Sequence, residues 1–454
     1  MDSQKIPADR LVYFGRKMAL EGRVPLALEA LGMGVQSDIV QGINIFDDVT
    51  CVETVSRVYE ELGLQTRTWA RLPGPDGHTP GKRTRIAYVQ SNIIDATNAQ
   101  TQRLLGLLRN HDTERFEVRV YSTEDFAKRP YPLLWVHQAM PSSTERGAGA
   151  IKECAARGMP VYVPSVHGTL LDTAYELGHE IANFDPDVVV YQGSPACPLQ
   201  CLLACWRLAP KQVNINVGVP MYLRGIDVTT CVSQFEVDRF TASWEQAKGT
   251  LAHINTGIDM SADVGEPDVE IPDRKKDEVV IMTVGNQLDR RVMPEFQNII
   301  MRVLQENPNA VYYIVGGGNF GAQMQLFQKA QVTRQVGFLG ASQKVRAVLK
   351  HADIYVNEFP IGGAQSVMEA MAEGLPVVAT HYSAKHQHCC GANYVGDEAV
   401  APYTPQAYYE KLTALVRDAE LRQATGAKLL AKVRAEHDYA VVTKQYEELY
   451  LDAT

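Results

Sequence analysis

The 454-residue sequence lacks most features that mark membrane, secreted or nucleic-acid-binding proteins. No apolar run approaches the roughly 20 residues that a membrane-spanning helix needs. The opening residues, MDSQKIPADRL, contain no apolar segment of the kind that forms a secretory signal. Acidic residues outnumber basic ones by 53 to 44, so nucleic-acid binding driven by net charge is not expected. We therefore expect a cytoplasmic protein without a transmembrane segment.

Cysteine is also sparse. The eight cysteines form no CxxC pair, which argues against both a disulfide scaffold and a redox motif. Cys197, Cys201 and Cys205 recur every four residues and would share one face of a helix. We interpret them as buried small residues rather than metal ligands.

A second cluster with metal-ligand chemistry lies in the segment HYSAKHQHCC, residues 381–390. Its His381, His386 and His388, followed by a cysteine pair, are residue types that bind zinc. Their spacing matches no standard zinc motif, so we predict no metal site here.

Length and composition indicate a folded chain with two large domains. Hydrophobic residues make up 45% and charged residues 21%, and domains typically hold about 100–200 residues. Within residues 1–78, the segment up to about Leu64 spaces its apolar side chains by three and four, which predicts helices. The breaker-rich stretch 72–82, LPGPDGHTPGK, predicts a linker after them. We expect these helices to form an appendage that either packs on the following domain or recognises a partner protein or a macromolecular acceptor, and we favour recognition.

The remaining sequence alternates short apolar strands with amphipathic helices in two successive sets. The first set spans residues 79–260 and the second spans 261–454, which ends in a long helical stretch. Near-continuous apolar strands separated by helices indicate parallel sheets covered on both faces. We predict an α/β protein with two tandem Rossmann-like domains that face each other across a ligand-binding cleft.

The stretch 357–379, NEFPIGGAQSVMEAMAEGLPVVA, carries the most chemical information. A strand ends, Gly362 and Gly363 form a turn, and a helix begins near Gln365. Glycines let backbone N–H groups approach an anion, and a helix start adds unpaired N–H groups and a positive dipole end. Ser366 adds another donor, and Glu369 can accept hydrogen bonds from a vicinal diol. Together they suit a diphosphate joined to a ribose, although the glycine pair alone could be a simple tight turn.

This stretch resembles the nucleotide-sugar site of GT-B fold glycosyltransferases, in particular the family-4 transferases and the protein O-GlcNAc transferases. Four other segments share the resemblance, which covers roughly residues 83 to 452. RIAYVQS through HDTERFEVRVYS (85–122), RLAPKQVNINVGVP (207–220) and GNQLDRR (285–291) resemble O-GlcNAc transferases. ELRQATGAKLLAKVRAEHDY (420–439) is more similar to family 4.

The resemblance implies a role for each matching donor-site residue. Glu369 would hold the ribose hydroxyls, while Gln365 and Ser366 would bind the diphosphate. Arg290 falls where a phosphate-binding lysine is expected, and Arg291 is its neighbour, so either guanidinium could neutralise the leaving diphosphate. The remaining residues implied in the donor site are Phe338, Leu339 and Gly340 at the base, Gly362 and Gly363 at the diphosphate, and Lys385 at the sugar or its phosphate. Gly316, Gly317 and Gly318 are expected to shape the same cleft or to form a plain loop.

The sequence departs from the family pattern where a catalytic base is expected. Family 4 places a second glutamate where this chain has Ile361, and the O-GlcNAc transferases place a histidine where it has Ala364. Asp95, in the loop after the first strand, is the first candidate base, with capping of the next helix as its alternative role. His167, in a later loop of the same domain, is the second candidate. Arg290 completes the residues expected in catalysis.

The resemblance implies transfer of a hexosyl or N-acetylhexosaminyl group from a nucleoside-diphosphate sugar, with UDP favoured. The acceptor would be a hydroxyl or amide, with a protein or peptide as one acceptor class, and no metal would be required. Two alternatives remain from the sequence: a non-catalytic transferase-like scaffold subunit and a nucleotide-sugar epimerase.

Overall fold

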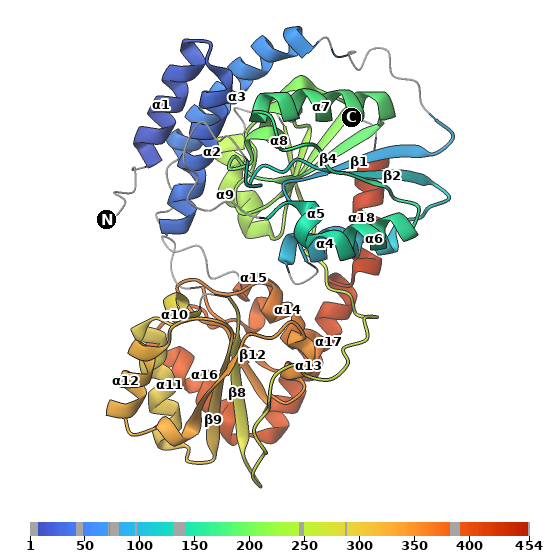
Figure 1. Cartoon of the computed structure of the whole chain (residues 1–454). Coiled ribbons are helices and arrows are strands. Elements are labelled where there is room, and N and C mark those ends of the chain that lie inside the picture. The colour runs from blue at the N-terminus through green and yellow to red at the C-terminus, as the bar shows by residue number, and fades with distance from the viewer. Residues whose placement is uncertain are drawn as a thin grey trace. The chain divides into compact units, whose positions relative to one another are not determined.

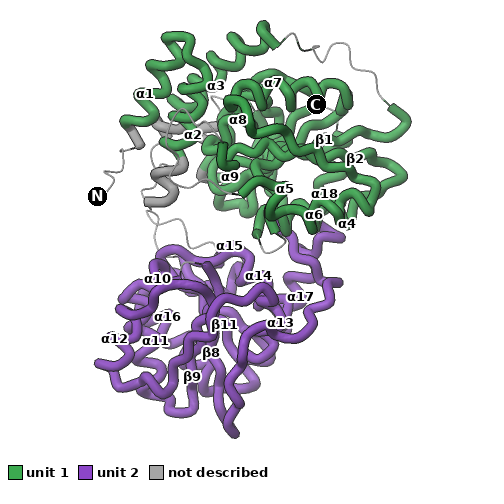
Figure 2. The backbone as a smooth tube through the Cα atoms, in the orientation of Figure 1, with its two compact units in different colours: residues 1–255, 443–454 green, residues 256–442 purple. Residues whose placement is uncertain are grey.

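The computed structural model describes residues 8–41, 49–70, 72, 81–95, 98–129, 141–244, 249–286, 288–381 and 391–452. The chain forms two compact units, coloured separately in Figure 2. Unit 1 contains residues 1–255 and 443–454, and unit 2 contains residues 256–442. The sequence had suggested a boundary after residue 260, with all later residues in the second domain. The structure places the boundary after residue 255 and assigns residues 443–454 to unit 1.

Unit 1 is built on a seven-stranded parallel sheet with the order β3-β2-β1-β4-β5-β6-β7. All seven strands lie within residues 79–260, where the alternation of apolar strands and helices predicted a parallel sheet. The strands are β1 (Thr84–Gln90), β2 (Phe116–Ser122), β3 (Val161–Tyr162), β4 (Val188–Gly193), β5 (Lys211–Asn216), β6 (Val228–Cys231) and β7 (Thr250–His253).

Helices cover both faces of this sheet (Figure 1). Alternation along β1 sends Ala87 and Val89 into a core shared with α7 and α8. Tyr88 points to the opposite face, where its hydroxyl meets that of Tyr450. The helices that follow β1 in the chain are α4 (Ala99–Asn110), α5 (Ser143–Arg146), α6 (Ala148–Ala156), α7 (Leu170–Phe184), α8 (Pro198–Trp206) and α9 (Gln234–Trp244).

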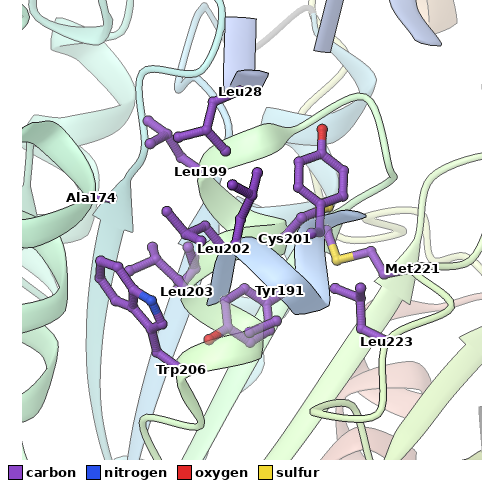
Figure 3. Close-up of a cluster of buried hydrophobic side chains, with 14 of the residues drawn as sticks. Leu28, Ala174, Tyr191, Leu199, Cys201, Leu202, Leu203, Trp206, Met221 and Leu223 are labelled. Atoms are coloured by element: carbon purple, nitrogen blue, oxygen red, sulfur yellow. The ribbon is translucent and has the colours of Figure 1, made fainter. Parts of the chain in front are cut away.

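The three N-terminal helices pack onto unit 1. They are α1 (Ala8–Leu20), α2 (Val24–Gln41) and α3 (Val49–Ala70). Leu28 of α2 lies in one apolar cluster with α8, as Figure 3 shows beside Leu199. Trp206 of α8 donates its indole N–H to Thr66 of α3 at 2.9 Å. The apolar faces of these helices are therefore covered by unit 1 itself, which is the packing alternative that the sequence left open.

Helix α8 carries the cysteine stripe into the same core. Cys197 and Cys201 are buried, as the interpretation of small core residues requires. Cys205 is partly buried and faces Gly63 of α3, where any added Cβ would overlap the cysteine side chain. The stripe thus allows α3 to approach α8 closely.

The last helix, α18 (Tyr439–Leu451), joins the two units covalently and ends in unit 1. Its Glu447 accepts a hydrogen bond from the His111 ring at 2.9 Å and another from the backbone N–H of Asp112 at 2.8 Å. Lys211 donates to backbone carbonyls near the C-terminal end of α18. These polar bonds explain why residues 443–454 belong to unit 1.

Unit 2 has a five-stranded parallel sheet with the order β10-β9-β8-β11-β12. Its strands occupy segments that the apolar pattern predicted. They are β8 (Val279–Val284), β9 (Ala310–Val315), β10 (Val336–Gly340), β11 (Ile354–Val356) and β12 (Val377–Val378).

Two apolar cores lie on opposite faces of this sheet. One contains Ile281 and Phe296 with α11 and α16, and the other contains Met282 and Met371 with α13, α14 and α17. The helices of unit 2 are α10 (Leu288–Arg291), α11 (Pro294–Glu306), α12 (Gly321–Lys329), α13 (Val345–Leu349), α14 (Gln365–Ala372), α15 (Gly391–Val395), α16 (Pro405–Arg417) and α17 (Ala419–Glu436). This is the Rossmann-like arrangement expected from the alternation of strands and helices.

Candidate donor site

The strand order of unit 2 selects one place at the sheet edge for a ligand. Connections leave β8 and β11 in opposite directions along the sheet, and open α/β sheets bind ligands at the carboxyl ends of the strands at such a switch point. The segment after β8 leads into α10 with Arg290 and Arg291, and the segment after β11 contains Gly362 and Gly363. Residues predicted to bind the donor therefore flank the switch point of the sheet.

The Gly362–Gly363 turn is held tightly against the end of β11. Asn357 donates its side-chain amide to the carbonyl of Gly363 at 3.0 Å. A Cβ on Gly362 would overlap the Asn357 side chain, and one on Gly363 would lie 2.5 Å from the hydroxyl oxygen of Ser366. A side chain at either position would meet these neighbouring atoms, so the close packing of this turn favours glycine.

Helix α14 begins directly after this turn. Its N-cap is Ala364, whose side chain has no acceptor for the first N–H groups. Those groups are consequently suited to bind an anion together with the positive end of the helix dipole. Tyr355 donates its hydroxyl to Ser366 at 2.8 Å, which leaves the proton of Ser366 available to donate.

Glu369 lies one turn into α14 and is 8% exposed. Burial raises its pKa to about 7, while a hydrogen bond from Gln365 and the charge of Arg346 oppose the rise. A buried carboxylate with limited pairing gains from new hydrogen-bond donors. Glu369 is thus chemically suited to accept hydroxyl groups, as the ribose prediction requires.

The two arginines of α10 have different surroundings. Arg290 is exposed, whereas the side chain of Arg291 is 17% exposed and forms a salt bridge with Glu358. Arg291 also donates to the carbonyls of Ile361 at 3.2 Å and Asn286 at 3.1 Å. Its guanidinium therefore links the segment after β8 to the segment after β11.

The two remaining donor segments meet at the same sheet edge. The N–H of Gly316 donates to the carbonyl of Gly340 at 2.7 Å, which joins the ends of β9 and β10. A Cβ on Gly316 would overlap the carbonyl of Gly285 after β8. Phe338 stacks near Phe320 with a centroid distance of 4.8 Å. The structure thus connects Phe338–Gly340 with the segment that leads to the arginines.

Comparison with known proteins agrees with this architecture. Residues 278–418 match the family described as glycosyl transferases group 1. No curated protein matches the chain. Among solved structures, an O-GlcNAc transferase mutant from Thermobaculum terrenum aligns over 98% of this chain and 90% of its own, with a TM-score of 0.60 at 15% identity.

Two further solved structures show the same fold. HepE from Anabaena, in complex with UDP and glucose, aligns over 81% of this chain and 99% of its own, with a TM-score of 0.56 at 14% identity. A glycosyltransferase from Rickettsia africae aligns over 82% and 98%, with a TM-score of 0.58 at 11% identity. The chain has the GT-B fold of glycosyltransferases. The family match falls on the unit that carries the predicted donor-site residues, and this match supports sugar transfer.

Unit 1 of the GT-B chain carries the two candidate bases at different positions of its sheet. Asp95 follows β1 and forms a salt bridge with Arg146 of α5. The alternative role of Asp95 as a helix cap is wrong, because Asn98 caps α4 and accepts from the N–H groups of Gln100 and Thr101 at 3.1 Å. His167 is exposed after the edge strand β3. Since β2 separates β3 from β1, the structure does not place the two candidates on neighbouring strands.

Several predicted residues of the GT-B chain lie outside the described residues. Lys385, His386 and His388 are among them, so only His381 of the histidine cluster is described. Within the described ranges, no group of three or more His, Cys, Asp or Glu side chains could hold a metal ion. No described helix is long and apolar enough to cross a membrane.

The sequence pattern did not predict two residues of this site, Tyr355 and Asn357, nor the pairing that Glu358 makes. Tyr355 positions Ser366, Asn357 holds the glycine turn, and Glu358 holds Arg291. All three lie at or just after β11, directly before the glycine pair. Polar residues that follow a buried strand at a switch point were the signal that could have found them.

Proposed function

We propose that this chain transfers a hexosyl or N-acetylhexosaminyl group from a nucleoside-diphosphate sugar, with UDP as the preferred nucleotide. The acceptor atom is a hydroxyl oxygen or amide nitrogen, and we propose a protein or peptide as its carrier. The observation that carries the proposal is the Gly362–Gly363 turn at the start of α14, with the buried Glu369 one turn away. The UDP and glucose of the distantly similar HepE structure favour the same class of donor.

In this proposal each donor-site residue acts on one part of the donor. The N–H groups at the start of α14, with Gln365 and Ser366, hold the diphosphate, and Glu369 accepts the ribose hydroxyls. The segment Phe338–Gly340 contacts the base. Lys385 contacts the sugar or its phosphate.

The reaction breaks the bond between the anomeric carbon and the diphosphate oxygen, and forms a bond from that carbon to the acceptor. Negative charge grows on the departing diphosphate, and Arg290 stabilises it without the need for a metal. The acceptor proton passes to a general base, for which we propose Asp95 or His167. Asp95 forms a salt bridge with Arg146 through one carboxylate oxygen in this structure.

Incubation of the chain with UDP-, GDP- and ADP-sugars tests this proposal. We expect release of a nucleoside diphosphate, fastest with a UDP-sugar and resistant to EDTA. Recovery of an isomerised nucleotide sugar would instead identify an epimerase. The absence of binding and turnover with all three donors would favour the scaffold alternative.

A further inference from the structure

Arg291 makes a three-point connection rather than presenting a free charge. Nε donates to Ile361, Nη1 donates to Asn286, and Nη2 bonds to the carboxylate of Glu358. A guanidinium has five N–H donors in a rigid fork, so one side chain can hold three acceptors on two segments. Three of those donors are therefore already committed to protein groups.

Glu358 depends on this connection because it is completely buried. Burial raises its pKa, while Arg291 and backbone N–H groups favour its ionised form. Its second oxygen, Oε2, has no hydrogen-bond partner among the described residues. Removal of either partner would leave a buried charge poorly compensated, so the two residues should act as a unit.

The unit lies directly against the glycine turn. A Cβ on Gly363 would lie 3.2 Å from Nη2 of Arg291, and Ile361, which precedes the turn, gives its carbonyl to Nε. The guanidinium therefore fixes the backbone that leads into the first N–H groups of α14. A small displacement of this backbone would misalign those donors.

We propose that Arg291 and Glu358 jointly position the Gly362–Gly363 turn for the donor diphosphate. Arg291 is then a positioning residue, and the exposed Arg290 is the guanidinium that contacts the diphosphate. This assignment rests on the proposed function, since it concerns the same donor site. It also gives Glu358 a role, although this residue does not occupy the position of the family's second glutamate.

Calorimetric binding of UDP to single and double variants tests the inference. Arg291→Lys keeps the positive charge but cannot hold three acceptors, and Glu358→Gln removes the carboxylate while it leaves the guanidinium in place. We expect each single variant to weaken UDP binding about tenfold. The double variant should bind UDP with the same affinity as the single variant that binds it less tightly. In turnover, we expect these variants to raise the donor KM more than they lower kcat, and Arg290→Gln to lower kcat more.

Arg274→Gln provides a matched control in the same unit. Arg274 pairs with Asp353 before β11, at the strand end opposite to Glu358. We expect this control to lower the unfolding midpoint without a change in UDP affinity. If Glu358→Gln does not fold, Glu358→Asp keeps the charge, shortens its reach and should show the same loss.

The outcomes separate this inference from the proposed function. If the wild type binds UDP and either Arg291→Lys or the folded variant of Glu358 binds it with near-normal affinity, the positioning role is overturned and the proposed function is not. An additive loss in the double variant would also overturn it, because independent contacts add. A wild-type chain that binds no nucleoside diphosphate would overturn the proposed function, and this inference with it.

Discussion

Neighbouring carboxylates on α14 have contrasting environments. Glu373 accepts a bond from Arg346 at 2.6 Å, whereas Glu369, one turn earlier, has its pKa raised by burial to about 7. An ionised group that is buried without a full set of partners lowers stability. The contrast is consistent with a structural role for Glu373 and with the donor-binding role proposed for Glu369.

Glu369→Gln should therefore weaken donor binding and stabilise the protein. Loss of charged hydrogen bonds to a ribose costs about 1.5–3 kcal/mol, which calorimetry with UDP would detect. Because the folded-state pKa is raised, the wild type loses stability as pH rises through about 7, and the variant does not. The expected gain at about pH 8 is on the order of 2–3 kcal/mol in urea unfolding. Glu373→Gln is the control and should lose stability while it retains UDP affinity.

The pH dependence of donor binding provides a second test of Glu369. The ribose hydroxyls need the ionised carboxylate, so a proton must leave when the donor binds below about pH 7. We expect the Kd for a UDP-sugar to rise about tenfold for each pH unit well below that value. Glu369→Gln should remove this dependence. An equally steep profile in the variant would assign the proton to another group.

At this scale the sequence predicted individual donor residues but not their connections. Gly362, Gly363 and Glu369 belong to one short motif, so spacing alone placed them together. The bond between Arg291 and Glu358 joins segments after two different strands, 67 positions apart. Such a pairing depends on strand order, which no local pattern contains.

Among the elements, the N-terminal helices show how an apolar pattern leaves its partner undefined. The spacing of three and four predicted helices with apolar faces, and such faces must be covered. The cover is α8, which is almost entirely buried and includes Trp206. The sequence of α8 is too uniformly apolar to indicate which neighbour would pack against it.

Leu28→Ala tests whether these helices belong to the fold of unit 1. Leu28 is 0% exposed, and a buried Leu→Ala change typically costs about 2–5 kcal/mol. We expect one cooperative transition at lower urea concentration for the signals of unit 1. Leu20→Ala, at a side chain that is 74% exposed, should leave the midpoint unchanged. A separate early transition for the helices alone would make them an independent appendage.

Most strands and helices could be predicted because their periodicity is local. Strand β2 and helix α7 continue the predicted alternation of apolar strands and amphipathic helices, whereas the sequence of β7, TLAH, is short and only half apolar and gives no such signal. The assignment of all residues from 261 to 454 to the second domain also relied on local patterns. Continuous helical periodicity through 439–451 does not show that α18 changes units partway along its length.

For the whole molecule, the return of α18 to unit 1 creates a dependence between distant parts of the sequence. Glu447 has its pKa lowered, because the bonds from His111 and the Asp112 N–H outweigh the effect of burial. A carboxylate with a depressed pKa contributes stability above its unfolded value of about 4.5, and this contribution is lost as pH falls further.

Glu447→Ala should consequently destabilise unit 1 by about 1.5–3 kcal/mol at neutral pH. The difference from wild type should shrink when urea unfolding is repeated at progressively lower pH below about 4.5, because the stability that comes from the ionised carboxylate is lost as pH falls through its lowered pKa. Glu448→Ala is the matched control, since Glu448 is the exposed neighbour on the same helix. A deficit for Glu447→Ala that is independent of pH would show that packing, not charge, holds this helix.

The discontinuous make-up of unit 1 also sets an order for biosynthesis. Unit 2 is one uninterrupted stretch inserted between the two parts of unit 1. Unit 1 therefore begins to emerge first, yet the partners that α18 and the residue after it supply to His111, Tyr88 and Lys211 are translated only after unit 2. Until then the Tyr88 face of the β1 sheet lacks the part of its cover that α18 supplies, and exposed apolar surface of this kind is what chaperones bind during synthesis.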